Sequence, residues 1–314
     1  MSDLFPVRIS AVEDLAEGIK GFELTALDGG ELPPFTAGSH IDVKLRIGLQ
    51  RSYSLVNPPS ERNRYVLGIA LDANSRGASR YIHRHFAAGE PVLISPPRNL
   101  FPLADSSAMS IFIAGGIGIT PFMSMQSHLN ALGRPWTLYY CARNPASAAY
   151  RSQLLTDPRV HCHFDSEQEG RFLDIARIVA EAPDDAHFYC CGPAGMLKSF
   201  MDAAGNIPDE RKHVEYFSPR AEASLEGGFK VELARSGRTL SVAPGQTIID
   251  VLREAGIGVP HSCLQGLCGS CEVPVLSGIP DHRDSVLSDA ERAAGRSMMI
   301  CCSGAKTDML VLDL

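Results

Sequence analysis

Residues 263–271 read CLQGLCGSC, and residues 298–305 read MMICCSGA. Four of these cysteines have the spacing with which thiolates hold a plant-type 2Fe-2S cluster: Cys263, Cys268, Cys271 and Cys301. The glycine and small residues between the first three allow backbone N–H groups to approach the sulfur atoms and stabilise their negative charge. The two stretches therefore predict a domain that transfers electrons.

The choice of fourth ligand and of metal follows from the same stretches. Cys301 and Cys302 are adjacent, and Cys301 fits the spacing better, so we assign Cys302 to packing. Zinc is the alternative to a cluster, but zinc sites favour paired CxxC hooks or mixtures of cysteine and histidine. We therefore expect an iron-sulfur cluster rather than zinc.

The residues before the cysteines predict that a third domain covers 229–314. FKVELARSGRTLSVAPG (229–245) is typical of a β-hairpin, and TIIDVLREAG (247–256) of a helix. A hairpin, a helix and then the cysteine loop is the order expected of a β-grasp ferredoxin. The polar, small-residue stretch SPRAEASLEGG (218–228) predicts a linker in front of this domain.

Residues 103–217 alternate between short apolar runs and helix-compatible segments. This alternation indicates an α/β nucleotide-binding domain, a parallel sheet with helices on its faces. The strand candidates are MSIFIAGG (109–116), WTLYYCAR (136–143), VHCHFD (160–165), HFYCCGP (187–193) and HVEYF (213–217).

Residues 1–102 consist of β-like runs between turn residues, which predicts a small β-barrel. HIDVKL (40–45), RSYSLV (51–56) and RYVLGIAL (64–71) are such runs, and a short helix is expected over 79–86. The length of 314 residues agrees with several domains rather than one core.

Charge and composition exclude several classes of partner. The net charge of −7 and the lack of a sustained basic run argue against nucleic acid or an anionic membrane as the main partner. No apolar run approaches the length of a bilayer span, and MSDLFPVRIS lacks the basic and apolar parts of a secretory signal. Five of the nine cysteines lie in the two stretches quoted above, and this concentration fits a reducing compartment, so we expect a cytoplasmic protein without structural disulfides.

The run RSYSL presents groups suited to a flavin. Arg51, Ser52, Tyr53 and Ser54 place a cation, an aromatic face and hydroxyls beside the backbone of a strand edge. In NSRGASRYIHRHF, a turn at 77–79 precedes the expected helix, where free N–H groups and the helix dipole favour a phosphate. Ordinary barrel packing and a simple serine cap are the alternative interpretations.

Two glycine turns end strands of the second domain. In IFIAGGIGITP a buried strand runs into a turn where Gly115, Gly116 and Gly118 permit close approach of a ligand to the backbone. FYCCGPAGM brings Cys191 and Gly192 to the same carboxyl edge, where open α/β sheets bind nucleotides. The first turn is not the G-x-G-x-x-G fingerprint, so a tight turn without a ligand is the alternative, as is a small buried cysteine.

Together, RSYS, GGIGITP, CGPAGM and the terminal cysteines resemble the ferredoxin reductase superfamily, and their order resembles the phthalate dioxygenase reductase family. The resemblance covers essentially the whole chain. That family places a flavin barrel first, an NADH domain second and a plant-type ferredoxin last, and its flavin is FMN. Ala78 departs from the glycine common there, and its methyl group is tolerated if its φ is negative. The resemblance implies these FMN contacts: Arg51, Ser52, Tyr53, Ser54, Gly77, Ala78 and Ser79.

The resemblance also implies where NADH binds. Gly116, Thr120 and Pro121 are expected to border the nicotinamide, and Cys191 and Gly192 to face its reacting carbon.

Three further residues carry expectations. Phe217 matches an aromatic residue that covers the flavin until the nicotinamide displaces it, with core packing as the alternative. Arg143 is expected near the adenosine ribose or a 2′-phosphate, and Asp165 would repel that phosphate, which favours NADH over NADPH. Solvated surface roles are the alternative for both residues.

NADH delivers two electrons together and a cluster accepts one at a time, so a flavin is needed between them. We therefore expect the NADH-dependent reductase component of a multicomponent oxygenase, most consistent with a Rieske non-haem iron oxygenase acting on an aromatic or other small organic acid. The predicted catalytic residues are Ser54, Cys191 and Phe217. The alternatives are a reductase serving a cytochrome P450, a redox-sensing or adaptor protein with the same cofactors, and a structural protein that has lost them. The agreement of four ligands and two cleft motifs disfavours the last.

Overall fold

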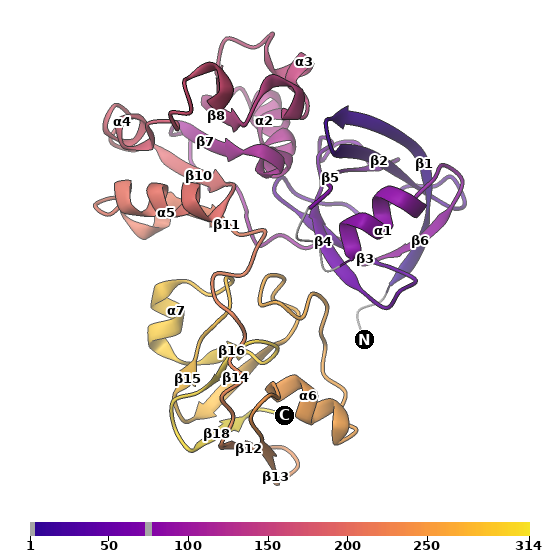
Figure 1. Ribbon diagram of the computed structural model, residues 1–314, viewed down its shortest axis with the longest axis vertical. Helices are drawn as coiled ribbons and strands as arrows, with labels where there is room; N and C mark the ends of the chain where they lie inside the picture. Colours follow the sequence, from indigo (N-terminus) through magenta and orange to yellow (C-terminus); the bar gives the residue numbers. More distant parts are fainter. Residues whose placement is uncertain (1–3, 73–76) are drawn as a thin grey trace. The chain divides into compact units, whose positions relative to one another are not determined.

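A computed structural model describes residues 4–72 and 77–314 of the protein. The described chain divides into two units, the barrel–sheet unit of residues 4–217 and the cysteine unit of residues 218–314. Figure 1 labels most of their helices and strands. None of the described helices combines the length and hydropathy that a bilayer span requires.

The first half of the barrel–sheet unit is a six-stranded antiparallel sheet of order β4-β3-β6-β1-β2-β5. A bridge between Leu55 and Leu67 joins its two end strands, so the sheet closes as the predicted barrel. Ile41 and Val43, two residues apart, point into its apolar core. The elements are β1 (Phe5–Ala16), β2 (Ile19–Ala26), β3 (His40–Lys44), β4 (Gln50–Ser54), β5 (Tyr65–Ala70), α1 (Ala78–His85) and β6 (Pro91–Ile94).

The second half is a parallel sheet of order β11-β10-β7-β8-β9 with helices on both faces (Figure 1). Phe112 of β7 packs on the α2 face, and Ile111 and Ile113 pack on the face covered by α4 and α5. The strands are β7 (Ser110–Gly115), β8 (Trp136–Ala142), β9 (Val160–Phe164), β10 (His187–Cys191) and β11 (Lys212–Glu215). The helices are α2 (Thr120–Leu132), α3 (Arg151–Leu154), α4 (Ile175–Ala180) and α5 (Ala194–Ala203), with 3-10 turns η1 (Gly116–Ile119), η2 (Pro145–Ser147), η3 (Asp165–Glu167) and η4 (Asp209–Arg211).

The barrel and the parallel sheet share one apolar core. Val56, just after β4, belongs to the same buried cluster as Phe112 of β7 and Phe122 of α2. The Gly38 N–H also donates to Ser124 Oγ of α2 at 3.2 Å. Residues of the two halves are therefore held in one packed unit.

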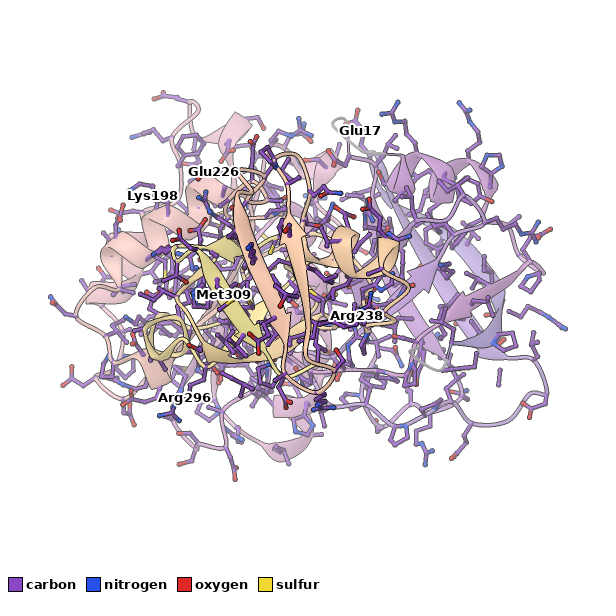
Figure 2. The ribbon with its side chains drawn as sticks, turned by 90° about the horizontal axis from the view of Figure 1, so that it is seen from below. Glu17, Lys198, Glu226, Arg238, Arg296 and Met309 are labelled. Atoms are coloured by element: carbon purple, nitrogen blue, oxygen red, sulfur yellow. The ribbon has the colours of Figure 1, made fainter. Side chains whose placement is uncertain are left out.

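The cysteine unit contains a mixed five-stranded sheet of order β13-β12-β18-β14-β16. β12 pairs antiparallel with β13, as the predicted hairpin requires, and parallel with β18 near the C-terminus. Figure 2 labels Arg238 at the start of β13 and Met309 at the start of β18. The elements are β12 (Phe229–Leu233), β13 (Arg238–Val242), α6 (Ile248–Glu254), β14 (Glu272–Ser277), β15 (Pro280–Asp281), α7 (Asp289–Ala294), β16 (Ser297–Met299), β17 (Gly304–Ala305) and β18 (Met309–Leu312).

The segment 218–228 contains no helix or strand and is hydrogen-bonded to the cysteine unit. The Arg220 N–H donates to Ser285 Oγ at 3.1 Å, and the Ser224 N–H donates to the Cys302 carbonyl at 2.8 Å. The domain boundaries at 102 and 217, and the function of 218–228 as a linker, stay predictions.

Candidate functional site

The four predicted cluster ligands are buried and meet in two pairs. Cys263 interacts with Cys268, and Cys271 with Cys301, through hydrogen bonds between their thiols. A cluster with two irons needs two thiolates on each iron, which two pairs supply. In the described part of the chain no three His, Cys, Asp or Glu side chains form a group that could hold a single metal ion, so the fit to a cluster rests on the pairs.

The loop between α6 and β14 is shaped to surround charged sulfur atoms. The Gln265 N–H donates to Cys263 Sγ at 3.3 Å, and the Cys263 N–H donates to Cys268 Sγ at 3.4 Å. Leu264 and Gly266 adopt left-handed φ angles of 55° and 68°, which curl the loop. Backbone N–H groups that reach thiolate sulfur stabilise its negative charge, so these residues fit the predicted 2Fe-2S cluster.

The two thiols of each pair differ in pKa. The hydrogen bond from the partner thiol lowers the pKa of Cys268 and raises that of Cys263. In the same way, the hydrogen bond between Cys271 and Cys301 lowers the pKa of Cys301 and raises that of Cys271. One thiol of each pair is therefore ready to deprotonate, as metal binding requires.

In the barrel, the predicted flavin residue Ser54 ends β4 with a hydroxyl that is free to bind a ligand. Its Oγ is buried without a hydrogen-bond partner among the described residues, and so is Nε2 of His40, its cross-strand neighbour on β3. Burial, followed by the charge of Arg98, lowers the pKa of His40 to about 4, so the imidazole is neutral at pH 7. Buried polar atoms without partners are rare in proteins, and a bound flavin would satisfy them.

Ser52 has a different environment from Ser54. Its hydroxyl donates to Asp42 Oδ1 at 2.6 Å, and Arg98 donates to Asp42 Oδ2 at 2.7 Å. Asp42 is fully buried on β3 and also accepts from Gln50 at 3.2 Å. The Ser52 hydroxyl therefore supports the strand that carries the predicted flavin contacts.

Arg51 and Tyr53 lie two residues apart on β4, and both are half-buried. The Arg51 guanidinium donates to the Gln50 carbonyl at 2.7 Å. Burial raises the pKa of Tyr53, so its phenol stays protonated and its ring is available as a flat apolar surface. The fit of these two side chains to a flavin stays a prediction.

The predicted phosphate turn begins helix α1. Gly77 is the N-cap with a left-handed φ of 106°, and Ala78 is the first helical residue. The left-handed conformation thus falls on the glycine, and the Ala78 methyl group causes no strain there. Ser79 Oγ accepts the Asp72 N–H at 3.2 Å. Three residues of the same motif, Asn74, Ser75 and Arg76, lie outside the described residues.

The two glycine turns of the parallel sheet contact each other directly. A Cβ atom at Gly118 would lie 2.2 Å from the Cys191 carbonyl oxygen, and one at Gly192 would lie 3.1 Å from Gly115 Cα. Only residues without a side chain allow this approach. Gly116 has a φ of 55° and open space where a side chain would lie. The turns therefore form a backbone cradle at the carboxyl edge of β7 and β10, as a nucleotide site requires.

This cradle borders the barrel. Thr120, the first residue of α2, donates its hydroxyl to the Ile117 carbonyl at 3.0 Å. A Cβ atom at Gly68 of β5 would lie 2.9 Å from Thr120 Cγ2 and 2.7 Å from the Tyr150 hydroxyl. The predicted nicotinamide residue Thr120 is thus brought against a barrel strand. Pro121 follows it, buried in the first turn of α2.

Two family models match the chain. The model of the 2Fe-2S iron-sulfur cluster binding domain matches residues 231–306, and that of the oxidoreductase NAD-binding domain matches residues 112–202.

The chain is also similar to full-length proteins. It is 50% identical over 309 residues to phenoxybenzoate dioxygenase subunit beta of Ectopseudomonas oleovorans, covering 98% of this chain and 97% of that one. It is 39% identical to the solved structure of phthalate dioxygenase reductase, with a TM-score of 0.75 and coverage of 99% of this chain and 98% of the other. The chain belongs to the phthalate dioxygenase reductase family.

A second solved structure is an intact type IV self-sufficient cytochrome P450 monooxygenase. It matches with a TM-score of 0.89 and 38% identity, over 99% of this chain but only 41% of the P450 chain. Our chain thus spans less than half of that larger protein.

Membership of the phthalate dioxygenase reductase family confirms the fold class and cofactors predicted from the sequence. This reductase is an NADH-dependent oxidoreductase with FMN and a plant-type 2Fe-2S cluster. The contacts of individual residues with those cofactors stay predictions.

The reductase places Arg143 and Asp165 at neighbouring strand ends. Arg143, which is exposed, follows β8, and its carbonyl accepts the Ser166 N–H at 2.9 Å. Asp165 begins the turn after β9, and its Oδ1 lies 3.7 Å from Nε2 of His163. Both residues therefore lie at the edge where the adenosine end of NADH is expected.

Cys191 and Phe217 differ in exposure. The Cys191 thiol is fully buried, and burial, followed by the charge of Glu215, raises its pKa well above the ordinary value, so it remains a neutral thiol. Phe217 follows β11 and is 39% exposed, and its expected place over the flavin stays a prediction.

Sequence reasoning missed Glu215, which lies opposite Cys191 in the β10–β11 register. The residue is only partly buried, but its Oε2 is inaccessible and has no hydrogen-bond partner among the described residues. Burial raises its pKa to about 8, so the carboxyl group is mostly protonated at pH 7. A glutamate inside the strand candidate HVEYF was the available signal. His40 was missed for a different reason, since a histidine within a barrel strand has no distinguishing pattern.

Proposed function

We propose that this reductase passes electrons from NADH, through FMN and the 2Fe-2S cluster, to a terminal Rieske-type oxygenase that acts on an aromatic or other small organic acid. The relative that is 50% identical is named as a subunit of phenoxybenzoate dioxygenase, and the solved relative as phthalate dioxygenase reductase. Both names support an oxygenase as the electron acceptor. The organic substrate is then chosen by the oxygenase and not by this chain.

The contact between the glycine cradle and the barrel carries the proposal. Thr120 packs against β5, and Val56, two residues beyond Ser54, shares a core with the parallel sheet. Residues expected to hold the nicotinamide and residues expected to hold the flavin thus belong to one packed unit, which suits a reaction that needs close and fixed reactants.

We assign separate tasks to the residues of this unit. When bound, NADH supplies a hydride, FMN accepts it, and the cluster carries the electrons onward one at a time. We expect Ser54 Oγ to hydrogen-bond the flavin, and the backbone of Gly116 and Gly118 to hold the nucleotide. The buried thiol of Cys191 and the neutral carboxyl of Glu215 exclude water at the strand ends without adding charge.

An anaerobic titration of the purified holoprotein with NADH tests the proposal. Flavin and cluster together accept three electrons, so full reduction should need about 1.5 NADH per chain. Absorbance follows the flavin, EPR follows the reduced cluster, and extraction identifies the flavin. An end point at one NADH without a cluster EPR signal would contradict the proposed route, and slow reduction of cytochrome c would favour a redox sensor.

A cytochrome P450 is the second candidate acceptor. It is supported by the TM-score of 0.89 to a chain that contains a P450 monooxygenase. Electron transfer to a purified Rieske oxygenase and to a bacterial P450 should be compared at equal concentrations of reductase. Faster NADH-dependent turnover of the P450 would replace our first candidate by the second.

We also propose that the protein works in the cytoplasm. All nine cysteines are free thiols in the structure, and thiols persist in a reducing compartment. Cell fractionation with an antibody to the native protein tests the location.

A further inference from the structure

A pocket of about 640 Å³ lies in the cysteine unit, between the turn after β14 and the C-terminal end of α7. Its volume is in the range of pockets that hold small molecules, on the order of 300–1,000 Å³. The pocket combines apolar walls with cationic and polar groups. Ile279, Pro280 and Ala294 are apolar, Arg292 and Lys306 are cationic, and His282 is polar.

The charge of the pocket is opposite to that of its surroundings. Residues 218–314 contain twelve aspartate and glutamate residues against nine lysine and arginine residues. Yet the ionisable residues that line the pocket are Arg292, Lys306 and His282, and no carboxylate is among the described lining residues. Lys306 is exposed, whereas the Arg292 side chain is 19% exposed and lies 3.6 Å from Oδ2 of the buried Asp284.

His282 gives the pocket a buried polar group whose hydrogen bonding is incomplete. Its side chain is 9% exposed, and neither ring nitrogen has a hydrogen-bond partner among the described residues. The nearest carboxylate oxygen, Asp284 Oδ1, lies 3.7 Å from Nδ1. A ligand oxygen would supply the acceptor that a buried N–H group of this ring lacks.

Asp284 does not complete the hydrogen bonding of the ring: its Oδ1 lies 3.7 Å from Nδ1 and has no hydrogen-bond partner itself among the described residues. Asp284 is fully buried, and its Oδ2 accepts the N–H groups of Val286 and Leu287 at 3.0 and 2.8 Å. Asp284 therefore lies behind the pocket wall. Burial, the largest influence, lowers the pKa of His282 despite this neighbouring carboxylate, so the ring is a neutral donor at pH 7.

We propose that this pocket binds a small organic carboxylate with a compact apolar body. Lys306 and Arg292 attract the carboxylate, the free ring N–H of His282 donates to it, and Ile279, Pro280 and Ala294 cover the apolar body. Inorganic phosphate would leave those apolar walls uncovered, and a neutral isostere would not use the two cations.

The pocket adjoins the cysteine loop through one residue. Arg292 donates to the Asp284 carbonyl at 2.5 Å. On its other side Asp284 is so close to Gly266 of the loop that a Cβ atom there would lie 2.8 Å from Asp284 Cα. A ligand on Arg292 would thus lie one residue away from the loop that carries three of the predicted cluster ligands.

Isothermal titration of the full-length holoprotein tests the proposal, with benzoate as the probe, benzamide as its neutral isostere and inorganic phosphate as an anion without an apolar body. Benzoate should bind at least about 10-fold more tightly than either, because each control lacks one of the two complementary features. Lack of benzoate binding up to about 10 mM overturns the proposal. So does benzamide or phosphate binding as tight as that of benzoate.

Variants then locate the site. Lys306→Gln should weaken benzoate binding about 5-fold or more, whereas Lys230→Gln, which removes the same charge on β12 outside the pocket, should leave it within about 2-fold. Arg292 also supports the Asp284 loop, so we use Ala294→Leu as the second variant. It fills the pocket from an exposed helix position and should abolish binding. Visible spectra establish that each variant keeps its cluster, and unchanged affinity in Lys306→Gln or Ala294→Leu overturns the assignment.

Discussion

At the scale of single residues, neighbouring side chains of one strand have opposite roles. Ser52 and Ser54 are both hydroxyls of β4, but Ser52 donates to the buried Asp42, whereas Ser54 Oγ has no partner among the described residues. The hydroxyl that the fold needs can therefore be separated from the hydroxyl that is left for a ligand.

Ser54→Ala should slow flavin reduction by NADH on the order of 10-fold, because it removes a hydrogen bond at the reacting flavin, while NADH affinity changes little. Its stability should stay within about 1 kcal/mol of wild type, since no protein hydrogen bond is lost. Ser52→Ala is the matched variant and should lose about 1.5–3 kcal/mol, because it breaks a bond to a buried charge. Stopped-flow absorbance and urea unfolding measure the two effects. Equal rates of reduction in wild type and Ser54→Ala would contradict the assigned role.

Glu215 predicts a dependence of stability on pH. Its pKa of about 8 in the folded protein lies above the ordinary 4.5, so the folded protein keeps a proton that the unfolded chain releases. The stability it contributes is complete below about pH 4.5 and is lost as the pH rises through about 8. Glu215→Gln stays neutral, so it should match wild type near pH 5 and exceed it at pH 9 by on the order of a few kcal/mol.

The fluorescence of Trp136, the single tryptophan of the chain, reports unfolding of the barrel–sheet unit in this experiment. Glu210→Gln, at an exposed position in the same unit, serves as the control and should follow wild type at both pH values. A constant difference between wild type and Glu215→Gln from pH 5 to 9 would show that the carboxyl group does not titrate in this range.

At the scale of elements, the two glycine turns of the parallel sheet depend on each other. Gly118→Ala would bring a Cβ atom to 2.2 Å from the Cys191 carbonyl, so one turn must move. We expect a loss of about 1–3 kcal/mol in stability and weaker NADH binding. Gly195→Ala, in α5 with open space around it, should instead be neutral or stabilising by up to about 1 kcal/mol. Thermal unfolding and NADH titration compare the two variants, and similar behaviour would refute the contact.

The cysteine loop distinguishes Cys301 from Cys302. Cys301 pairs with Cys271, whereas the Cys302 thiol interacts with Cys301 alone among the cysteines named here and donates to the Met299 carbonyl at 3.8 Å. Cys301→Ser should therefore lose or strongly perturb the EPR signal of the reduced cluster, whereas Cys302→Ser should keep it and cost about 1 kcal/mol of stability. The reverse result would exchange the fourth ligand and the packing residue.

At the scale of the whole molecule, calorimetry should resolve two unfolding transitions rather than three. The barrel and the parallel sheet share a core and should unfold together, while the cysteine unit has its own core. Cys301→Ser should lower only the transition of the cysteine unit, because cluster binding stabilises that unit alone. Three separate transitions would show that the shared core is too weak to couple the two halves.

How much of this structure the sequence predicts depends on how far apart in the chain the interacting residues lie. Strand and helix positions such as 40–45 and 247–256 follow from local periodicity, and the structure has β3 and α6 there. The cluster ligands were found because three of them lie in nine residues. The ion pair of Asp42 with Arg98 joins residues 56 apart, and the burial of Glu215 depends on its packing, so no local pattern reports either.

The chain divides into two units after residue 217, and the reactions expected of these units tolerate different distances between the reacting groups. Hydride transfer requires reacting atoms about 3–3.5 Å apart, and the residues predicted to bring them together lie in one body with a continuous interior. A single electron can tunnel across a wider gap, and the predicted iron ligands lie on the other side of the division. Natural sequence change in segment 218–228 should therefore be far less harmful to catalysis than change in the interior that joins barrel and sheet.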